Sequence, residues 1–178
     1  MGAVKKGFTL IEVMVVISVI ALVVPALFYM VFMILLQQVK IYRLSEAKRQ
    51  GDFALTAITS NIRNSAVSIY DANNTTELCS GTGDVSDVGK FRDQYDNWFS
   101  YTLISGKISS GSSIFNTTTD LTKQNVTISD MTLKCYKTAS FSPSIVEVKF
   151  TITAGDAAAR TEEKASLVYQ TRVKLRSY

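Results

Sequence analysis

Histidine is absent from the 178 residues of this chain. Its absence excludes a histidine general base, a Ser-His-Asp triad and imidazole ligands for a metal ion. The sequence also lacks a recognisable nucleophile motif and a glycine-rich phosphate-binding loop. We therefore do not expect an enzyme, and we predict no cofactor and no metal site.

Cysteine is scarce as well, because only Cys79 and Cys135 occur in the chain. They are too far apart in sequence for the Cys-x-x-Cys spacing of redox and zinc sites. If the domain that carries them lies outside the cytoplasm, they are candidates for a disulfide, which requires their Cα atoms to lie within about 7 Å.

Charge is nearly balanced, with 19 Lys and Arg residues against 15 Asp and Glu residues and a formal net charge of +4. No run of five like charges occurs anywhere in the sequence. A surplus of this size does not indicate nucleic acid as the main partner.

A long apolar run dominates what is present, since no charged side chain occurs from Val13 to Leu36. Such a run is typical of a cleaved secretory signal, a membrane anchor or a buried core helix. The apolar region of a signal has roughly 7–15 residues, whereas this run, as a helix, spans about 36 Å and crosses a hydrocarbon core of about 30 Å. Length therefore favours an anchor that remains on the protein.

Two residues in this region have a special chemistry: Glu12 at its start and Pro25 inside it. An ionised carboxylate in an apolar span is costly unless it is paired, so Glu12 is a candidate functional residue. The alternative is that its side chain only reaches out to the membrane interface. Pro25 cannot donate a backbone hydrogen bond to the carbonyl of Ala21, which predicts a kink or a locally melted turn.

The charges that flank the apolar run leave its orientation open. Two lysines precede it and four cations follow it: Lys5 and Lys6, then Lys40, Arg43, Lys48 and Arg49. Because a long domain is translocated largely regardless of charge, counting these residues does not decide which side is inside.

Beyond Gln37 the composition becomes amphipathic without a helix-breaking signal, which predicts a helix over about 37–69 with one apolar side. The apolar positions are Ile41, Leu44, Ala47, Ala54, Ile58, Ile62, Ala66 and Ile69. Turn formers at 71–76 are expected to end this helix, and 70–97 is predicted as a loop region. Acids in Cys79–Asn97 suggest a calcium loop, but their spacing matches no EF-hand, so a solvated loop is the preferred interpretation.

Runs of β-branched and aromatic residues predict the strands Trp98–Ser105, Asn125–Ile128, Thr132–Tyr136, Ile145–Thr153 and Ala165–Leu175. The last two alternate between apolar and polar residues, as expected for strands with one buried face. The polar segments Gly106–Thr119 and Ala154–Glu163 are predicted as loops. The predicted fold class is α+β: a long N-terminal helix, half transmembrane and half amphipathic, packed on a C-terminal antiparallel β-sheet over 98–178.

The sequence Gly7-Phe8-Thr9-Leu10-Ile11-Glu12, placed between two lysines and the apolar run, resembles the class III signal of type IV pilins and type II secretion pseudopilins. The resemblance implies cleavage after Gly7 by a prepilin peptidase on the cytoplasmic face and methylation of the new amino terminus on Phe8. It also implies that the cysteine-containing domain lies outside the cytoplasm. In this family the glutamate at the position of Glu12 is thought to balance the free amino terminus of a neighbouring subunit.

Later segments resemble a narrower group, the J-type minor pseudopilins and related minor pilins. The similarity lies in the helix around Ile62-Arg63-Asn64-Ser65-Ala66 and in scattered pieces of the late strands. The chain departs from many major pilins, which have proline at the position of Tyr29 and glycine at that of Ala21. Pro25 is the candidate for the same local melting of the helix.

The resemblance implies a structural filament subunit with a pilin-like fold, located at or near the tip of the filament. It implies a cleaved leader over 1–7, a transmembrane or filament-core helix over 8–36 and a globular domain over 37–178. The expected partners are a prepilin peptidase, sibling pilins or pseudopilins and the inner-membrane assembly platform, and the expected location is the bacterial inner membrane followed by an extracytoplasmic filament. The alternatives are a tip adhesin or DNA-uptake or substrate-recognition pilin that uses the loops Cys79–Asn97 and Gly106–Thr119, and a bitopic membrane sensor or enzyme.

Overall fold

The computed structural model describes residues 7, 9–79, 86–114, 116–155 and 164–175. The chain divides into two compact units, residues 1–41 and residues 42–178. Helix α1 (Leu10–Ser65) has 56 residues and supplies both the apolar segment of the first unit and the helix of the second. In the first unit the large apolar side chains, from Leu10 to Leu36, are exposed.

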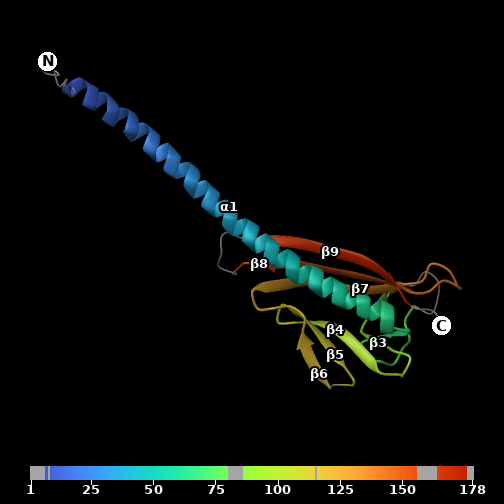
Figure 1. The fold of residues 1–178 in the computed structure, drawn as a ribbon. Coiled ribbons are helices and arrows are strands. Elements are labelled where there is room, and N and C mark those ends of the chain that lie inside the picture. The colour runs from blue at the N-terminus through green and yellow to red at the C-terminus, as the bar shows by residue number, and fades with distance from the viewer. Residues whose placement is uncertain (1–6, 8, 80–85, 115, 156–163, 176–178) are drawn as a thin grey trace, which may run out of the picture. The chain divides into compact units, whose positions relative to one another are not determined.

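The second unit combines the end of α1 with two antiparallel sheets (Figure 1). Sheet A has the strand order β1-β3-β4-β5-β6, and sheet B has the order β2-β7-β8-β9. The strands of sheet A are β1 (Ser68–Tyr70), β3 (Lys90–Arg92), β4 (Trp98–Ile104), β5 (Lys107–Ser112) and β6 (Thr117–Asp120). Those of sheet B are β2 (Ser86–Asp87), β7 (Val126–Tyr136), β8 (Ile145–Ala154) and β9 (Ala165–Lys174).

One face of α1 and the inner faces of both sheets form the core of the second unit. On the helix the buried residues recur every three or four positions: Ala47, Gln50, Gly51, Ala54, Ile58 and Ile62. On the sheets the large, fully buried side chains include Phe91, Ile108, Val146, Val148, Phe150 and Ile152. Each such side chain contributes roughly 1.5–3 kcal/mol by leaving water, so this shared core holds helix and sheets together.

Gly51 allows α1 to approach sheet B closely. A Cβ at this position would lie 2.3 Å from Cε2 of the Tyr169 ring. That ring stacks on Phe150 with the centroids 5.2 Å apart, and its hydroxyl lies 3.1 Å from each of two acceptors, the Lys48 carbonyl and the Asp52 carboxylate. Burial and the nearby Asp52 carboxylate raise the pKa of Tyr169 to about 12. The contact therefore depends on a residue without a side chain in the middle of the helix.

The α+β class and the packing of one helix on antiparallel sheets are confirmed. The helical apolar stripe is confirmed from Ala47 to Ile62, but Ile41 and Leu44 are exposed. The helix ends at Ser65, not near residue 69, so Ala66 and Ile69 are buried beyond it, Ile69 in β1. The strands also form two sheets, whereas the sequence predicted one.

The prediction of a loop over Gly106–Thr119 was wrong, because this segment contains β5 and most of β6. Its serines and threonines pair in register across β4, β5 and β6, as in Tyr101 to Ser110 and Ser110 to Thr119. Strands β1, β2 and β3 likewise occur where a loop over 70–97 was predicted or just before it. Hydroxyl side chains give no apolar alternation, so the strand signal is weak although the backbone pairing is regular.

Strand β7 joins the two predicted strands Asn125–Ile128 and Thr132–Tyr136 into one, with a shift of register between Ser129 and Thr132. Asp130 has a φ of 53° at this irregularity, which marks it as a bulge. The predicted loop Ala154–Glu163 falls mostly outside the described residues.

The hydrogen bonds that Glu46 accepts are expected to make the free energy of unfolding of the second unit sensitive to acid. Its carboxylate accepts hydrogen bonds from the Gln50 amide at 3.0 Å, the Asn125 amide at 2.9 Å and the Arg49 guanidinium at 2.8 Å. These bonds lower the pKa of Glu46 from 4.5 to about 2. The pKa of Glu46 is lower in the folded chain than in the unfolded one. Ionised Glu46 therefore stabilises the fold fully above pH 4.5, and this stabilisation is lost as the pH falls toward 2.

We expect a Glu46→Gln variant to lose less stability than the wild type between pH 5 and pH 2.5, as measured by urea unfolding at several pH values. Glu77, whose carboxylate makes no hydrogen bond or ion pair in the described structure, provides the matched control as Glu77→Gln. Equal pH dependence of Glu46→Gln and wild type would contradict the assignment.

Candidate functional site

The first turn of α1 brings Thr9 and Glu12 together. The backbone N–H and the hydroxyl of Thr9 each lie 3.4 Å from Oε2 of Glu12. The backbone N–H groups of Glu12 and Val13 donate to the Thr9 carbonyl at 3.1 and 3.3 Å. Thr9 and Glu12 thus occupy the first and last positions of a capping box, in which the glutamate satisfies a free N–H at the start of the helix.

The structure describes only some of the motif residues around this turn. Gly7 is exposed, and a Cβ built on it would meet no atom within 4 Å. Phe8, the predicted methylation site, lies outside the described residues, as do residues 1–6 of the predicted leader over 1–7.

Pro25 lies inside α1, and every residue from Leu10 to Ser65 is helical. The locally melted turn predicted at Pro25 is therefore not present in the single chain, which leaves a kink as the remaining prediction. Within the described residues α1 is the one helix that is long and apolar enough to cross a membrane, judged by length and composition. With their apolar side chains exposed, the residues around Pro25 need lipid or other apolar helices around them.

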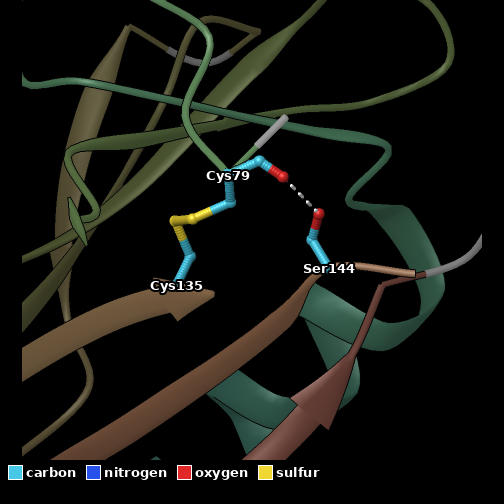
Figure 2. Close-up of a disulfide and its surroundings, with 3 residues drawn as sticks. All are labelled: Cys79, Cys135 and Ser144. Atoms are coloured by element: carbon cyan, nitrogen blue, oxygen red, sulfur yellow. Dashed lines mark hydrogen bonds between the residues drawn. A yellow bond between two sulfur atoms is a disulfide. The ribbon is translucent and has the colours of Figure 1, made fainter. Parts of the chain in front are cut away.

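Cys79 and Cys135 form a disulfide that links the segment after β1 to the end of β7 (Figure 2). Their Cα atoms lie 6.1 Å apart, and both residues are buried. The Ser144 hydroxyl donates a hydrogen bond to the Cys79 carbonyl at 3.1 Å, which adds a contact from the loop before β8 (Figure 2). The segment after β1 is thereby joined to both sides of the β7–β8 connection at one end of sheet B.

Residues 3–24 match a protein-family model, the prokaryotic N-terminal methylation motif. The chain carries the signature of type IV pilins and pseudopilins. No curated protein and no solved structure gives a significant match to the chain. The matched segment contains Gly7, Phe8 and Glu12, and Pro25 lies one residue beyond it.

The acidic segment Cys79–Asn97 lies partly outside the described residues. In its described part Asp93 accepts hydrogen bonds from the backbone N–H groups of Tyr95 and Asn97, both at 2.8 Å, and Asp96 pairs with Arg92. These carboxylates therefore stabilise a turn between β3 and β4. Among the described residues no three Asp, Glu, His or Cys side chains gather as a metal site would require.

Sequence reasoning missed a polar cleft between α1 and the inner face of sheet A. The cleft has a volume of about 520 Å³, and its walls include Asn61, Asp93, Trp98, Ser110 and Thr119. Next to it the Asn61 amide donates to the Tyr101 hydroxyl at 2.8 Å, and burial raises the pKa of Tyr101. The signal that was available is the polar residue Asn61 beside the buried positions Ile58 and Ile62.

Proposed function

We propose that this chain is a minor pilin or pseudopilin, a structural subunit of a type IV pilus or type II secretion pseudopilus, located at or near the filament tip. The observation that carries the proposal is the methylation motif over residues 3–24, followed at once by an exposed apolar helix. The narrower assignment as a minor, tip-located subunit is supported by the resemblance of the amphipathic helix to J-type pseudopilins. We assign it no enzymatic role.

Processing by a prepilin peptidase is the first step that we propose for this chain. Removal of residues 1–7 would leave Phe8 as the amino terminus, and methylation there would produce a secondary amine that remains positively charged. The exposure of Gly7 itself supports access by the peptidase. The leader would lie in the cytoplasm and the residues after α1 outside it, which places Cys79 and Cys135 where disulfides persist.

Assembly into the filament depends, in this proposal, on Glu12. Its carboxylate contacts only Thr9 in the described structure, at a long 3.4 Å, so it retains free acceptor capacity. Moving residues 8–36 from lipid into a bundle of like helices changes apolar burial little, because both surroundings are apolar. A carboxylate and an ammonium that meet in such a bundle offset each other's desolvation, so the pair selects the register of one subunit against the next.

The proposal divides the mature chain into a filament-core helix over 8–36 and a globular domain over 37–178. The buried stripe from Ala47 to Ile62 begins after the first of these segments and supports the division. The proposed partners are sibling pilins or pseudopilins and the inner-membrane assembly platform.

Filaments sheared from cells that express an epitope-tagged chain test this proposal. We expect the tagged chain in the sheared filament fraction, and we expect it to stay in the membrane when the prepilin peptidase is inactivated. A chain that remains in the membrane fraction of cells with intact filaments and an active peptidase would contradict a filament role.

A further inference from the structure

Strand β9 forms one edge of sheet B, and in the described part of the chain no strand pairs with its free side (Figure 1). All of its residues, from Ala165 to Lys174, pair with β8 in one unbroken register. A long, regular edge is a template for pairing with another strand. Proteins commonly protect such edges with proline, a bulge or charged side chains, and the stretch from Ser166 to Thr171 contains none of these.

A hydrogen bond just beyond β9 shows which of its backbone groups face the free side. The Leu175 N–H donates to the Ser144 carbonyl at 2.9 Å, and this pair continues the register of β8 and β9. In an antiparallel ladder every second pair is hydrogen-bonded. Odd-numbered residues of β9 therefore direct their N–H and C=O groups toward β8, and even-numbered residues, from Ser166 to Arg172, direct theirs away from it. These residues offer regularly spaced donors and acceptors to an added strand.

The side chains of β9 also leave apolar surface that an added strand can cover. Leu167 and Tyr169 pack against the core but are only half-buried. On the opposite face of the strand Val168 is 64% exposed. Side chains of a neighbouring strand lie directly beside such residues and remove them from water, so pairing at this edge extends the sheet on both faces.

A cleft gives this edge its charge. It lies between the ends of α1 and β9, has a volume of about 620 Å³ and is lined by Arg63, Asn64, Arg172, Lys174 and Leu175. The nearby carboxylate of Glu147 pairs with Arg172 at 3.0 Å. Three cations and one carboxylate leave a surplus of two positive charges among the described residues at this end of β9.

The surplus identifies the chemistry of the strand that fits. From Ala165 to Lys174 the strand contains no Asp or Glu, so a second copy of β9 cannot supply the missing negative charge. An extended segment with carboxylates beside the cleft can pair with Arg63 and Lys174. Such charge-assisted hydrogen bonds are stronger than bonds between neutral groups, so they favour an acidic segment over a neutral or basic one.

We infer that the free edge of β9, together with the cleft, binds an extended acidic segment of a partner protein, which adds to sheet B as an antiparallel strand. The antiparallel direction matches every described strand pair of the sheet. This inference goes beyond the proposed filament role and does not depend on it. It also differs from the sequence-based expectation, in which recognition was assigned to the loops Cys79–Asn97 and Gly106–Thr119.

Fluorescence anisotropy with the full chain in zwitterionic detergent micelles tests the inference. The probe is a labelled peptide of about ten residues in which valine and glutamate alternate, a pattern suited to a strand with one apolar and one acidic face. We expect this peptide to bind, with an affinity that falls as salt is added. A peptide in which valine and lysine alternate has the same pattern with the opposite charge, and it should bind at least about tenfold more weakly.

Methylation of the peptide backbone tests the hydrogen bonds without changing the protein. In an antiparallel addition the glutamates share the face of Arg172 and Lys174 and stand opposite the even-numbered residues of β9, so their N–H groups point at β9. Methylating the amide nitrogens of the glutamates should therefore weaken binding at least about tenfold. Methylating those of the valines, which point away from β9, should leave the affinity near that of the unmodified peptide.

Val168→Pro tests the same bonds from the side of the protein. Its N–H faces the free edge, so proline removes a group offered to the partner and keeps the pairing with β8. We expect at least about tenfold weaker binding of the valine–glutamate peptide and nearly unchanged thermal unfolding. Thr118→Pro is the matched control in β6, an edge strand of sheet A, because the Leu121 N–H donates to the Ile108 carbonyl and the alternation turns the Thr118 N–H away from β5. It should bind as the wild type does.

The double variant Arg63→Gln, Lys174→Gln tests the charge of the cleft. We expect at least about fivefold weaker binding of the valine–glutamate peptide at low salt and a smaller salt dependence. Lys40→Gln, Lys123→Gln makes the same change of charge at two exposed lysines elsewhere and should bind as the wild type does.

The inference would be overturned if the valine–glutamate peptide did not bind at low salt, or if the valine–lysine peptide bound equally well. Equal losses in Val168→Pro and Thr118→Pro, or in the two double charge variants, would also overturn it. If Val168→Pro failed to fold, the methylated peptides would decide, because equal binding by the two of them would exclude pairing through one edge of the added strand.

Discussion

The Glu12→Gln variant is expected to fold and to remain in the membrane, yet to enter filaments at least about a hundredfold less efficiently than the wild type. Glutamine retains the oxygen that Thr9 approaches at 3.4 Å, and it is accepted in a capping box, so the start of α1 is preserved. What disappears is the negative charge. Leaving a buried ammonium without its partner costs about 3–5 kcal/mol, which corresponds to this loss of incorporation.

The variant Thr9→Ala separates the capping role of Glu12 from its charge. It removes the hydroxyl that contacts Glu12 and costs about 1 kcal/mol of helix stability, but it keeps the carboxylate. We therefore expect it to enter filaments far better than Glu12→Gln. The measurement is the ratio of tagged chain in sheared filaments to tagged chain in membranes. If Glu12→Gln assembled normally while Thr9→Ala failed, Glu12 would act only as a helix cap.

Removal of the disulfide is expected to cost about 4 kcal/mol of unfolding free energy. The bridge joins residues separated by 56 positions, and a closed loop of this size removes that much conformational freedom from the unfolded chain. The double variant Cys79→Ala, Cys135→Ala avoids placing hydroxyl groups in the core, because both cysteines are buried. Denaturant unfolding of the full chain in detergent, without reductant, measures the difference.

Reductant provides the internal control for this prediction. It should destabilise the wild type to nearly the level of the double variant and should leave the variant unchanged. A difference below about 1 kcal/mol between the oxidised wild type and the variant would mean that the hydrogen bond from Ser144 and the surrounding packing hold this end of sheet B without the bridge. An unchanged mobility of the wild type on non-reducing and reducing gels would mean that the bridge does not form.

The sequence predicted the buried face of α1, strand β8 and the N-terminal motif, because in each of them the residue type follows directly from the physical role. Apolar residues spaced by three or four positions predicted the buried face of α1 from Ala47 to Ile62, because a helix needs such a stripe to pack on a sheet. The alternation in Ile145–Thr153 predicted β8 to within one residue for the same reason. The motif around Gly7 and Glu12 is local, so it was readable without any knowledge of the fold.

The features that sequence reasoning missed depend on pairing between distant segments. Strands β5 and β6 consist largely of Ser and Thr, and only their pairing with β4 shows that they are not loops. Gly51 was passed over, although a glycine in a helix interior often indicates a close approach, here by Tyr169.

The central claim, that this chain is processed as a pilin, is tested most directly by mass spectrometry of the mature amino terminus. The chain should be isolated from cells that assemble the filament. The account predicts a first residue of Phe8 carrying one methyl group on its amine, with residues 1–7 absent. A chain that begins at Met1, or one cut at another position, would contradict it.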